Sequence, residues 1–120
     1  MKHVLIVDDS QTIRREVSDA LSQAGFAVVE AEDGVAGLEC ARLQEFSMIL
    51  VDVNMPRMGG LDMLDHLKRD PKTASIPVLL ITTEADAELV QRARDAGAKG
   101  WLVKPIKLKQ VVSTVSALAV

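Results

Sequence analysis

The stretch VLIVDDS, residues 4–10, decides the fold because it joins a strand signal to a chemical one. Four apolar residues run directly into Asp8 and Asp9. A short, largely β-branched run of this kind is typical of a strand that is covered on both faces, as in a parallel sheet. Adjacent carboxylates repel each other, so a pair of them at the end of a buried strand calls for a compensating partner.

Length and composition describe one domain with an aliphatic core. The chain has 120 residues, of which 48% are hydrophobic, and its aromatic side chains are Phe26, Phe46 and Trp101. The formal net charge of -3 gives no basic footprint for nucleic acid or an anionic membrane. Cys40 is the single cysteine, which favours a reducing compartment. No apolar run approaches the roughly 18 residues of a membrane span. The first residues reach two aspartates too early for a secretory signal, so we expect a cytoplasmic domain.

Two kinds of apolar segment alternate along the chain. Short β-branched runs predict strands at residues 4–7, 26–29, 48–51, 78–81 and 101–103. Helical spacing between them predicts helices over residues 13–24, 61–67, 90–96 and 108–118, and residues 34–43 form a fifth helix with a weaker pattern. Strands that alternate with single helices predict an α/β fold, a doubly wound five-stranded parallel sheet with five helices. We expect a single domain over residues 1–120, with no output domain.

Polar side chains follow four of the predicted strands. They are Asp8 and Asp9 after the first, Asp52 and Asn54 after the third, Thr82 and Thr83 after the fourth, and Lys104 after the fifth. Parallel strands end at the same edge of a sheet, and ligands bind in the crevice outside those ends. We therefore expect these side chains to form one site.

Three neighbouring carboxylates cannot all remain charged without help. One interpretation is a protonated cluster, or an aspartate paired with Lys104; the other is a hard divalent cation. Mg²⁺ takes oxygen ligands, typically one or two carboxylates together with waters and a phosphate oxygen. An aspartate can attack phosphorus, and a metal, an ammonium group and a hydroxyl can each neutralise one phosphoryl oxygen. The pattern favours a phosphoryl-transfer site.

These residues also carry a resemblance to a known family. The motifs are VDDS at 7–10, AEDGVAGL at 31–38, VDVNMPRMGGLDML at 51–64, ITTEAD at 81–86 and GAKGWLVKPI at 97–106. With them the chain resembles, over its whole length, the receiver domain of two-component response regulators, and in particular the single-domain, CheY-like members with a flavodoxin-like fold. The resemblance implies a phosphorylatable signalling switch that is not an enzyme beyond catalysing its own phosphorylation and dephosphorylation.

The resemblance implies a role for each polar residue at this edge. Asp52 is the expected phosphoacceptor, Lys104 pairs with a phosphoryl oxygen, and Thr82 donates its hydroxyl to another. Mg²⁺ is the expected cofactor, and its expected ligands are Asp9, Asp52, the backbone carbonyl of Asn54 and, through water, Asp8. The Lys104–Pro105 peptide bond is expected to be cis. The side chains of Asn54 and Glu84 hold positions that tune the access of water to the acyl phosphate.

The resemblance also implies how the signal leaves the domain. Trp101 takes the place of the switch aromatic, which follows Thr82 toward the phosphoryl group. The changed surface is the helix–strand–helix region over residues 86–119, where a protein target binds. The expected partners are a histidine kinase as phosphodonor and that target, possibly in chemotaxis, with no nucleic acid and no membrane, and the domain is expected to be a monomer. The alternative is an intermediate or phosphate sink in a phosphorelay.

Two other function classes fit the fold less well. A phosphohydrolase of the haloacid-dehalogenase type requires D-x-D-x-[TV] after the first strand, whereas residues 8–12 read DDSQT. A flavodoxin-like binding module would need a phosphate-binding loop at the same place, and neither G-x-G-x-x-G nor a hydroxyl-rich loop occurs there. Steady turnover of phosphate esters would favour the first class, and a flavin or nucleotide retained on purification would favour the second.

Overall fold

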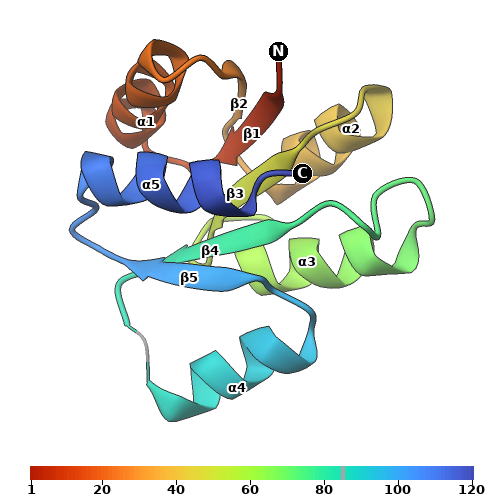
Figure 1. The fold of residues 1–120 in the computed structure, drawn as a ribbon. Helices are drawn as coiled ribbons and strands as arrows, with labels where there is room; N and C mark the ends of the chain where they lie inside the picture. The colour runs from red at the N-terminus through yellow and green to blue at the C-terminus, as the bar shows by residue number, and fades with distance from the viewer. Residues whose placement is uncertain (85) are drawn as a thin grey trace.

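The computed structural model describes residues 1–84 and 86–120, and over these residues it contains a five-stranded parallel sheet between two layers of helices (Figure 1). Strands and helices alternate along the chain without exception in this part. They are β1 (His3–Val7), α1 (Gln11–Gln23), β2 (Ala27–Ala31), α2 (Gly34–Leu43), β3 (Met48–Asp52), α3 (Gly60–Arg69), β4 (Val78–Thr82), α4 (Ala87–Asp95), β5 (Gly100–Val103) and α5 (Leu108–Leu118). Ala85, within the motif at 81–86, lies outside the described residues.

The strand order is β2-β1-β3-β4-β5, and every neighbouring pair is parallel. The predicted doubly wound α/β sheet is therefore confirmed. The chain adds β2 on one side of β1 and then returns to add β3 on the other side. The order of strands reverses at this point, and the helices that follow β1 and β3 leave a crevice at the carboxyl ends of the strands. The expected site residues lie at this edge.

Alternation along each strand produces two aliphatic cores, one on each face of the sheet. On one face, Leu5, Val7, Ile49, Val51 and Leu80 pack with residues of α2, α3 and α4; on the other, Val4, Ile6, Leu50 and Ile81 pack with residues of α1 and α5. Figure 1 shows α1 and α5 on one side of the sheet and α2 to α4 on the other. Burying one such side chain contributes about 1.5–3 kcal/mol. Burial on both faces explains why the central strands read as unbroken apolar runs.

The end of the second strand and the buried face of the last helix differ from the sequence prediction, whereas the bounds of that helix, residues 108–118, agree with it. The second strand runs to Ala31 rather than ending near residue 29, because Ala31 pairs with Val7 of β1 and extends the ladder past the apolar run. Leu108, counted in the apolar stripe of the last helix, is 37% exposed as the first residue of α5, and the buried face begins at Val111.

Side-chain caps begin three of the helices at the same edge of the sheet. Ser10 accepts from the Ile13 N–H at the start of α1, and Asp33 accepts from the Ala36 N–H at the start of α2. Asp86 caps α4 through the Leu89 N–H. These helix N-termini carry partial positive charge, which favours negative groups at this edge. Across the described residues, no helix has the length and hydropathy needed to cross a membrane.

Candidate functional site

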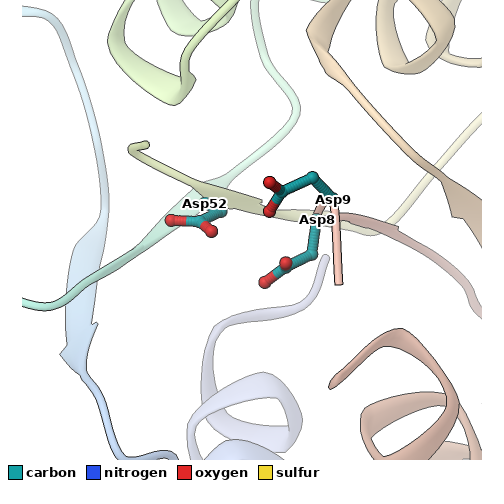
Figure 2. A group of neighbouring side chains, drawn as sticks. All are labelled: Asp8, Asp9 and Asp52. Carbon is teal, nitrogen blue, oxygen red and sulfur yellow. The ribbon is translucent and has the colours of Figure 1, made fainter. Parts of the chain in front are cut away.

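Asp8, Asp9 and Asp52 converge at the carboxyl ends of β1 and β3. One carboxylate oxygen from each lies within 4.8 Å of the others. Figure 2 shows the side chains of Asp8 and Asp9 extending to the side on which Asp52 lies. Because β1 and β3 are neighbours with Val7 opposite Val51, the residues that follow each strand meet across the edge. The three are unequal in their surroundings, since Asp8 and Asp52 are buried and Asp9 is exposed.

Hydrogen bonds hold Asp8 on three sides. Its N–H donates to the carbonyl of Ala31 at 3.1 Å, and its Oδ1 accepts from the Ser10 N–H at 2.9 Å. The Arg14 guanidinium donates to its backbone carbonyl at 2.6 Å and lies 3.4 Å from Glu30 on β2. Among the described residues, Oδ2 has no hydrogen-bond partner although it is buried. This oxygen is the one left for a ligand.

Asp52 has partners for both carboxylate oxygens. The Lys104 ammonium group donates to Oδ2 at 2.9 Å, and the Asn54 N–H donates to Oδ1 at 3.1 Å. Lys104 also lies 3.8 Å from Asp8 Oδ2. Lys104 therefore contributes one positive charge to three carboxylates, and the cluster keeps an excess of negative charge. The Lys104–Pro105 peptide bond is cis, as expected.

The pKa values of Asp8 and Lys104 are both raised, mainly by burial for Asp8 and by the neighbouring aspartates for Lys104. Burial raises the pKa of Asp8 above its usual value; the Ser10 N–H opposes this, while the charge of Asp52 adds to it. For Lys104, burial acts to lower the pKa, but the hydrogen bond to Asp52 and the charges of the aspartates outweigh it, and the pKa is raised. Lys104 therefore remains charged near neutral pH, whereas an ionised Asp8 is costly without further positive charge.

The donor set fits a hard divalent cation. All candidate ligand atoms are carboxylate oxygens of Asp8, Asp9 and Asp52, and Asp8 Oδ2 is buried without a hydrogen-bond partner among the described residues. Mg²⁺ takes one or two carboxylates and keeps several waters, and this open cluster of carboxylates matches that preference. Asp9 and Asp52, with the backbone carbonyl of Asn54, would hold the ion, and Asp8 would act through water.

Thr82 ends β4 beside this cluster, but its hydroxyl is engaged elsewhere. Thr82 Oγ1 donates to the Glu84 carbonyl at 2.7 Å and accepts from the Glu84 N–H at 3.1 Å. The side chain is buried at 2% exposure. Asn54 and Glu84 are both exposed, and they line an open hollow of about 370 Å³ between the ends of β3 and β4. These two side chains therefore face the same hollow, which Thr82 also lines.

Trp101 lies on β5, one strand beyond Thr82. It is partly buried against the core on the α4 side, and the Arg94 guanidinium lies 5.5 Å from the centre of its ring. A small apolar cavity of about 10 Å³ separates Trp101 from Thr82 and is bordered by Val53, Leu89 and Val90. The cavity is far smaller than an indole, and its lining residues Leu89 and Val90 belong to α4.

Glycines bring α3 against the end of β3. A Cβ at Gly60 would lie 2.6 Å from the Asp52 carbonyl oxygen, and one at Gly59 would lie 2.6 Å from that of Val53. The Gly60 N–H also donates to the Val53 carbonyl at 3.1 Å. The first turn of α3 therefore packs directly behind the expected phosphoacceptor, where a side chain would not fit.

The sequence interpretation missed two arginines at this edge. Arg14 contacts the Asp8 backbone, and Arg57 pairs with Asp33, which caps α2. Asp33 and Ser10 carry a local signal, because each directly precedes a helix and caps it. The arginine contacts carry no local signal, since Arg57 and Asp33 are 24 residues apart in the chain.

Comparisons with known proteins agree on one family. The sequence profile of the response regulator receiver domain matches residues 4–116. The chain is 41% identical over 103 residues to the chemotaxis protein CheY-3 of Vibrio cholerae. The aligned residues make up 85% of this chain and 79% of that protein. It is 36% identical to the probable chemotaxis protein CheY of Rhizobium etli, over 96% of this chain and 90% of that protein. The solved structure of Vibrio cholerae CheY4 at low pH superposes with a TM-score of 0.94 at 38% identity, covering 98% of each chain.

Proposed function

Because the chain belongs to the response regulator receiver domain family, we propose that it is a phosphorylatable switch that accepts a phosphoryl group on Asp52. Receiver domains are signalling switches rather than classical enzymes. The observation that carries the proposal is the meeting of Asp8, Asp9 and Asp52 with Lys104 at one sheet edge, from three separated parts of the chain. Within this family the phosphodonor is expected to be a phosphohistidine of a sensor kinase.

Asp52 is the nucleophile of the proposed transfer. A carboxylate oxygen of Asp52 forms a bond to phosphorus as the phosphorus–nitrogen bond of the donor histidine breaks, and the departing imidazole nitrogen takes up a proton. Bound Mg²⁺ supplies positive charge for the phosphoryl oxygens. Asp9 and Asp52 would hold the ion together with the Asn54 carbonyl, and Asp8 would orient a water bound to it.

Lys104 and Thr82 must exchange partners during this reaction. Lys104, which donates to Asp52 Oδ2 at 2.9 Å before the reaction, would transfer this contact to an oxygen of the phosphoryl group bonded to Asp52. Thr82 gives up the Glu84 carbonyl and turns its hydroxyl toward the phosphoryl group. Both new contacts exist only in the phosphorylated state, so they shift the population toward a second conformation.

The output of the switch is proposed to lie on the α4–β5–α5 face. Val103 of β5 pairs with Thr82 of β4, so a change at Thr82 is transmitted to β5, and Trp101 lies on that strand. A protein target on this face would distinguish the two conformations. The chemotaxis relatives favour a target in that pathway. The alternative role is a relay intermediate or phosphate sink.

Phosphorylation with a small donor tests the proposal. Incubation with acetyl phosphate and Mg²⁺ should add one phosphoryl group, detected by mass spectrometry of the intact protein. Asp52→Asn should abolish the addition, whereas Asp65→Asn, an exposed aspartate of α3, should leave it unchanged. Failure of the wild type to label, or labelling of Asp52→Asn, would show that the site has another function.

A second experiment separates an output role from a phosphate sink. The protein activated with beryllofluoride and Mg²⁺, and the unactivated protein as reference, are used to capture partners from cell extract. A target retained only by the activated form supports an output through contact. A partner set confined to kinases and phosphotransfer proteins supports the relay or sink role.

A further inference from the structure

Arg57 lies in the loop after β3 and has an unusual backbone conformation. Its φ is +65°, in the left-handed region, and among the described residues it is the one non-glycine residue with positive φ. The Met58 N–H donates to the Pro56 carbonyl at 2.8 Å across Arg57, which closes a tight γ-turn of the rarer hand. A strained conformation of this kind persists only where the surroundings impose it.

An ion pair to a buried carboxylate holds this turn. The Arg57 Nε and Nη2 atoms both donate to Asp33 Oδ2, with Nε at 2.9 Å. Asp33 is 5% exposed, and its other oxygen caps α2 through the Ala36 N–H at 2.9 Å. Both carboxylate oxygens are thus used, one by the helix and one by the loop. Charge-assisted bonds to a buried carboxylate are stronger than neutral ones.

A second contact ties the same turn to α2. A Cβ at Gly34, the first residue of α2, would lie 2.7 Å from both the carbonyl oxygen and the Cγ atom of Met58. The backbones approach this closely because Gly34 has no side chain. The turn over residues 56–58 is therefore attached to the start of α2 by an ion pair and by packing.

The other end of the loop is attached to the sheet. The Val53 N–H donates to the Ile81 carbonyl at 2.8 Å, and the Val53 carbonyl accepts from the Gly60 N–H at 3.1 Å. Asn54 lies between the two anchored ends, and its N–H donates to Asp52 Oδ1. The loop segment that carries Asn54 is thereby fixed relative to Asp52 from both directions.

We propose that Asp33 and Arg57 are positioning residues for Mg²⁺, because their ion pair fixes the loop that presents the Asn54 carbonyl. The inference rests on the proposed function, in which Asn54 supplies a backbone ligand. A preorganised loop loses little conformational freedom when the ion binds, and groups outside the direct ligands commonly set metal affinity in this way.

Two variants remove the Asp33–Arg57 ion pair without removing the helix cap or adding strain to the backbone. Arg57→Gly removes the charge while favouring the positive φ, and Asp33→Asn removes the charge while retaining a side chain that caps helices. Calorimetric titration of the protein with Mg²⁺ alone should show affinity weakened by about tenfold in each variant. The double variant should be no weaker than either single one, because both substitutions remove the same interaction. In metal-free protein, the amides of Met58 and Gly60 should exchange with solvent faster in both variants.

The control is a surface ion pair far from the site. Arg42 at the end of α2 pairs with Asp70 at 3.2 Å, and Arg42→Ala should leave Mg²⁺ affinity unchanged. Labelling of Arg57→Gly by acetyl phosphate should need more Mg²⁺ for half-maximal rate yet reach the wild-type rate at saturation.

Wild-type Mg²⁺ affinity in Arg57→Gly, or a reduced labelling rate that excess Mg²⁺ does not restore, would overturn the inference. If Asp33→Asn fails to fold, Arg57→Gly alone decides. A wild type that neither binds Mg²⁺ nor labels at Asp52 would refute the proposed function instead, so the two failures are distinguishable.

Discussion

Asp8 belongs to the site although its burial disfavours the charged form of its side chain. Its backbone and Oδ1 are held by Ala31, Ser10 and Arg14. Its buried Oδ2 has no hydrogen-bond partner among the described residues, and the Lys104 ammonium group lies 3.8 Å from it. A buried acceptor without a hydrogen bond costs about 1–3 kcal/mol. In metal-free protein this cost is part of the native state, and a bound cation would relieve it.

Replacing Asp8 by Asn should therefore stabilise the metal-free protein. We expect the free energy of unfolding to rise by about 1–3 kcal/mol at neutral pH with a chelator present, because a charge without adequate compensation is removed. The measurement is urea unfolding followed by circular dichroism. The same variant should lose most of the stabilisation that Mg²⁺ gives the wild type.

The pH dependence of the free energy of unfolding tests whether the charge of Asp8 causes the effect of Asp8→Asn. Its pKa in the folded protein is raised above the ordinary value of 3.8, mainly by burial. The cost of charging it is fully present above the folded-state pKa and absent below 3.8, so the stability of the wild type falls as pH rises through this window. The advantage of Asp8→Asn should shrink as pH is lowered. An advantage that persists unchanged in acid would contradict this explanation.

At the scale of elements, the first turn of α3 and the end of β3 act as one unit. Gly59 and Gly60 allow the helix to approach the backbone of Val53 and Asp52, and the Gly60 N–H donates to Val53. The N-terminus of α3 therefore lies directly behind the expected phosphoacceptor. The position of Asp52 depends on how this helix packs as well as on its own strand.

Gly60→Ala tests this packing because two principles predict opposite signs. Helix propensity alone favours Ala over Gly by about 1 kcal/mol. The new methyl group would lie 2.6 Å from the Asp52 carbonyl oxygen, and overpacking of this kind costs about 1–3 kcal/mol.

We expect Gly60→Ala to have a lower free energy of unfolding and slower labelling of Asp52. Ser116→Ala, at an exposed position of α5, provides the propensity reference and should be neutral or slightly stabilising. A Gly60→Ala protein as stable as the wild type would show that the strand end has room to move.

For the whole molecule, the two aliphatic cores make the sheet a rigid frame with a functional edge. The central strands are buried on both faces, whereas α4 contributes Ala93 as its one buried residue among those described. The cavity beside Thr82 also lies under α4. Few buried contacts mean low local stability, so α4 is the element best able to move when the site changes.

Trp101 reports this movement because it is the single tryptophan of the chain. Activation with beryllofluoride and Mg²⁺ should change its fluorescence, since Thr82 must leave Glu84 and the packing between β4, β5 and α4 must adjust. Thr82→Ala should blunt the change, and Thr83→Ala, at an exposed neighbouring position, should retain it. Equal fluorescence changes in the two variants would show that the response of Trp101 does not depend on Thr82.

Local patterns were sufficient to predict the fold class and the residues to examine. Each strand is an unbroken apolar run because both faces of the sheet are covered, and the polar residues after each run converge because parallel strands share one edge. β2 was predicted to end two residues too early, since its last residues are held by pairing with β1 rather than by their own hydropathy. The roles of Asp52, Lys104, Thr82 and Trp101 remain predictions that the experiments above test.

The sequence by itself determined the order of strands and helices, the aliphatic core and the convergence of Asp8, Asp9, Asp52 and Lys104, because periodicity and position after a strand are properties of local chain. Only the tertiary structure decided that Asp8 is buried while Asp9 is exposed, and that the Thr82 hydroxyl is engaged by Glu84. It also decided that Arg57 reaches back to Asp33. These features depend on how separate elements pack. Packing brings together residues that are distant in the chain, and no local sequence pattern indicates that they will meet.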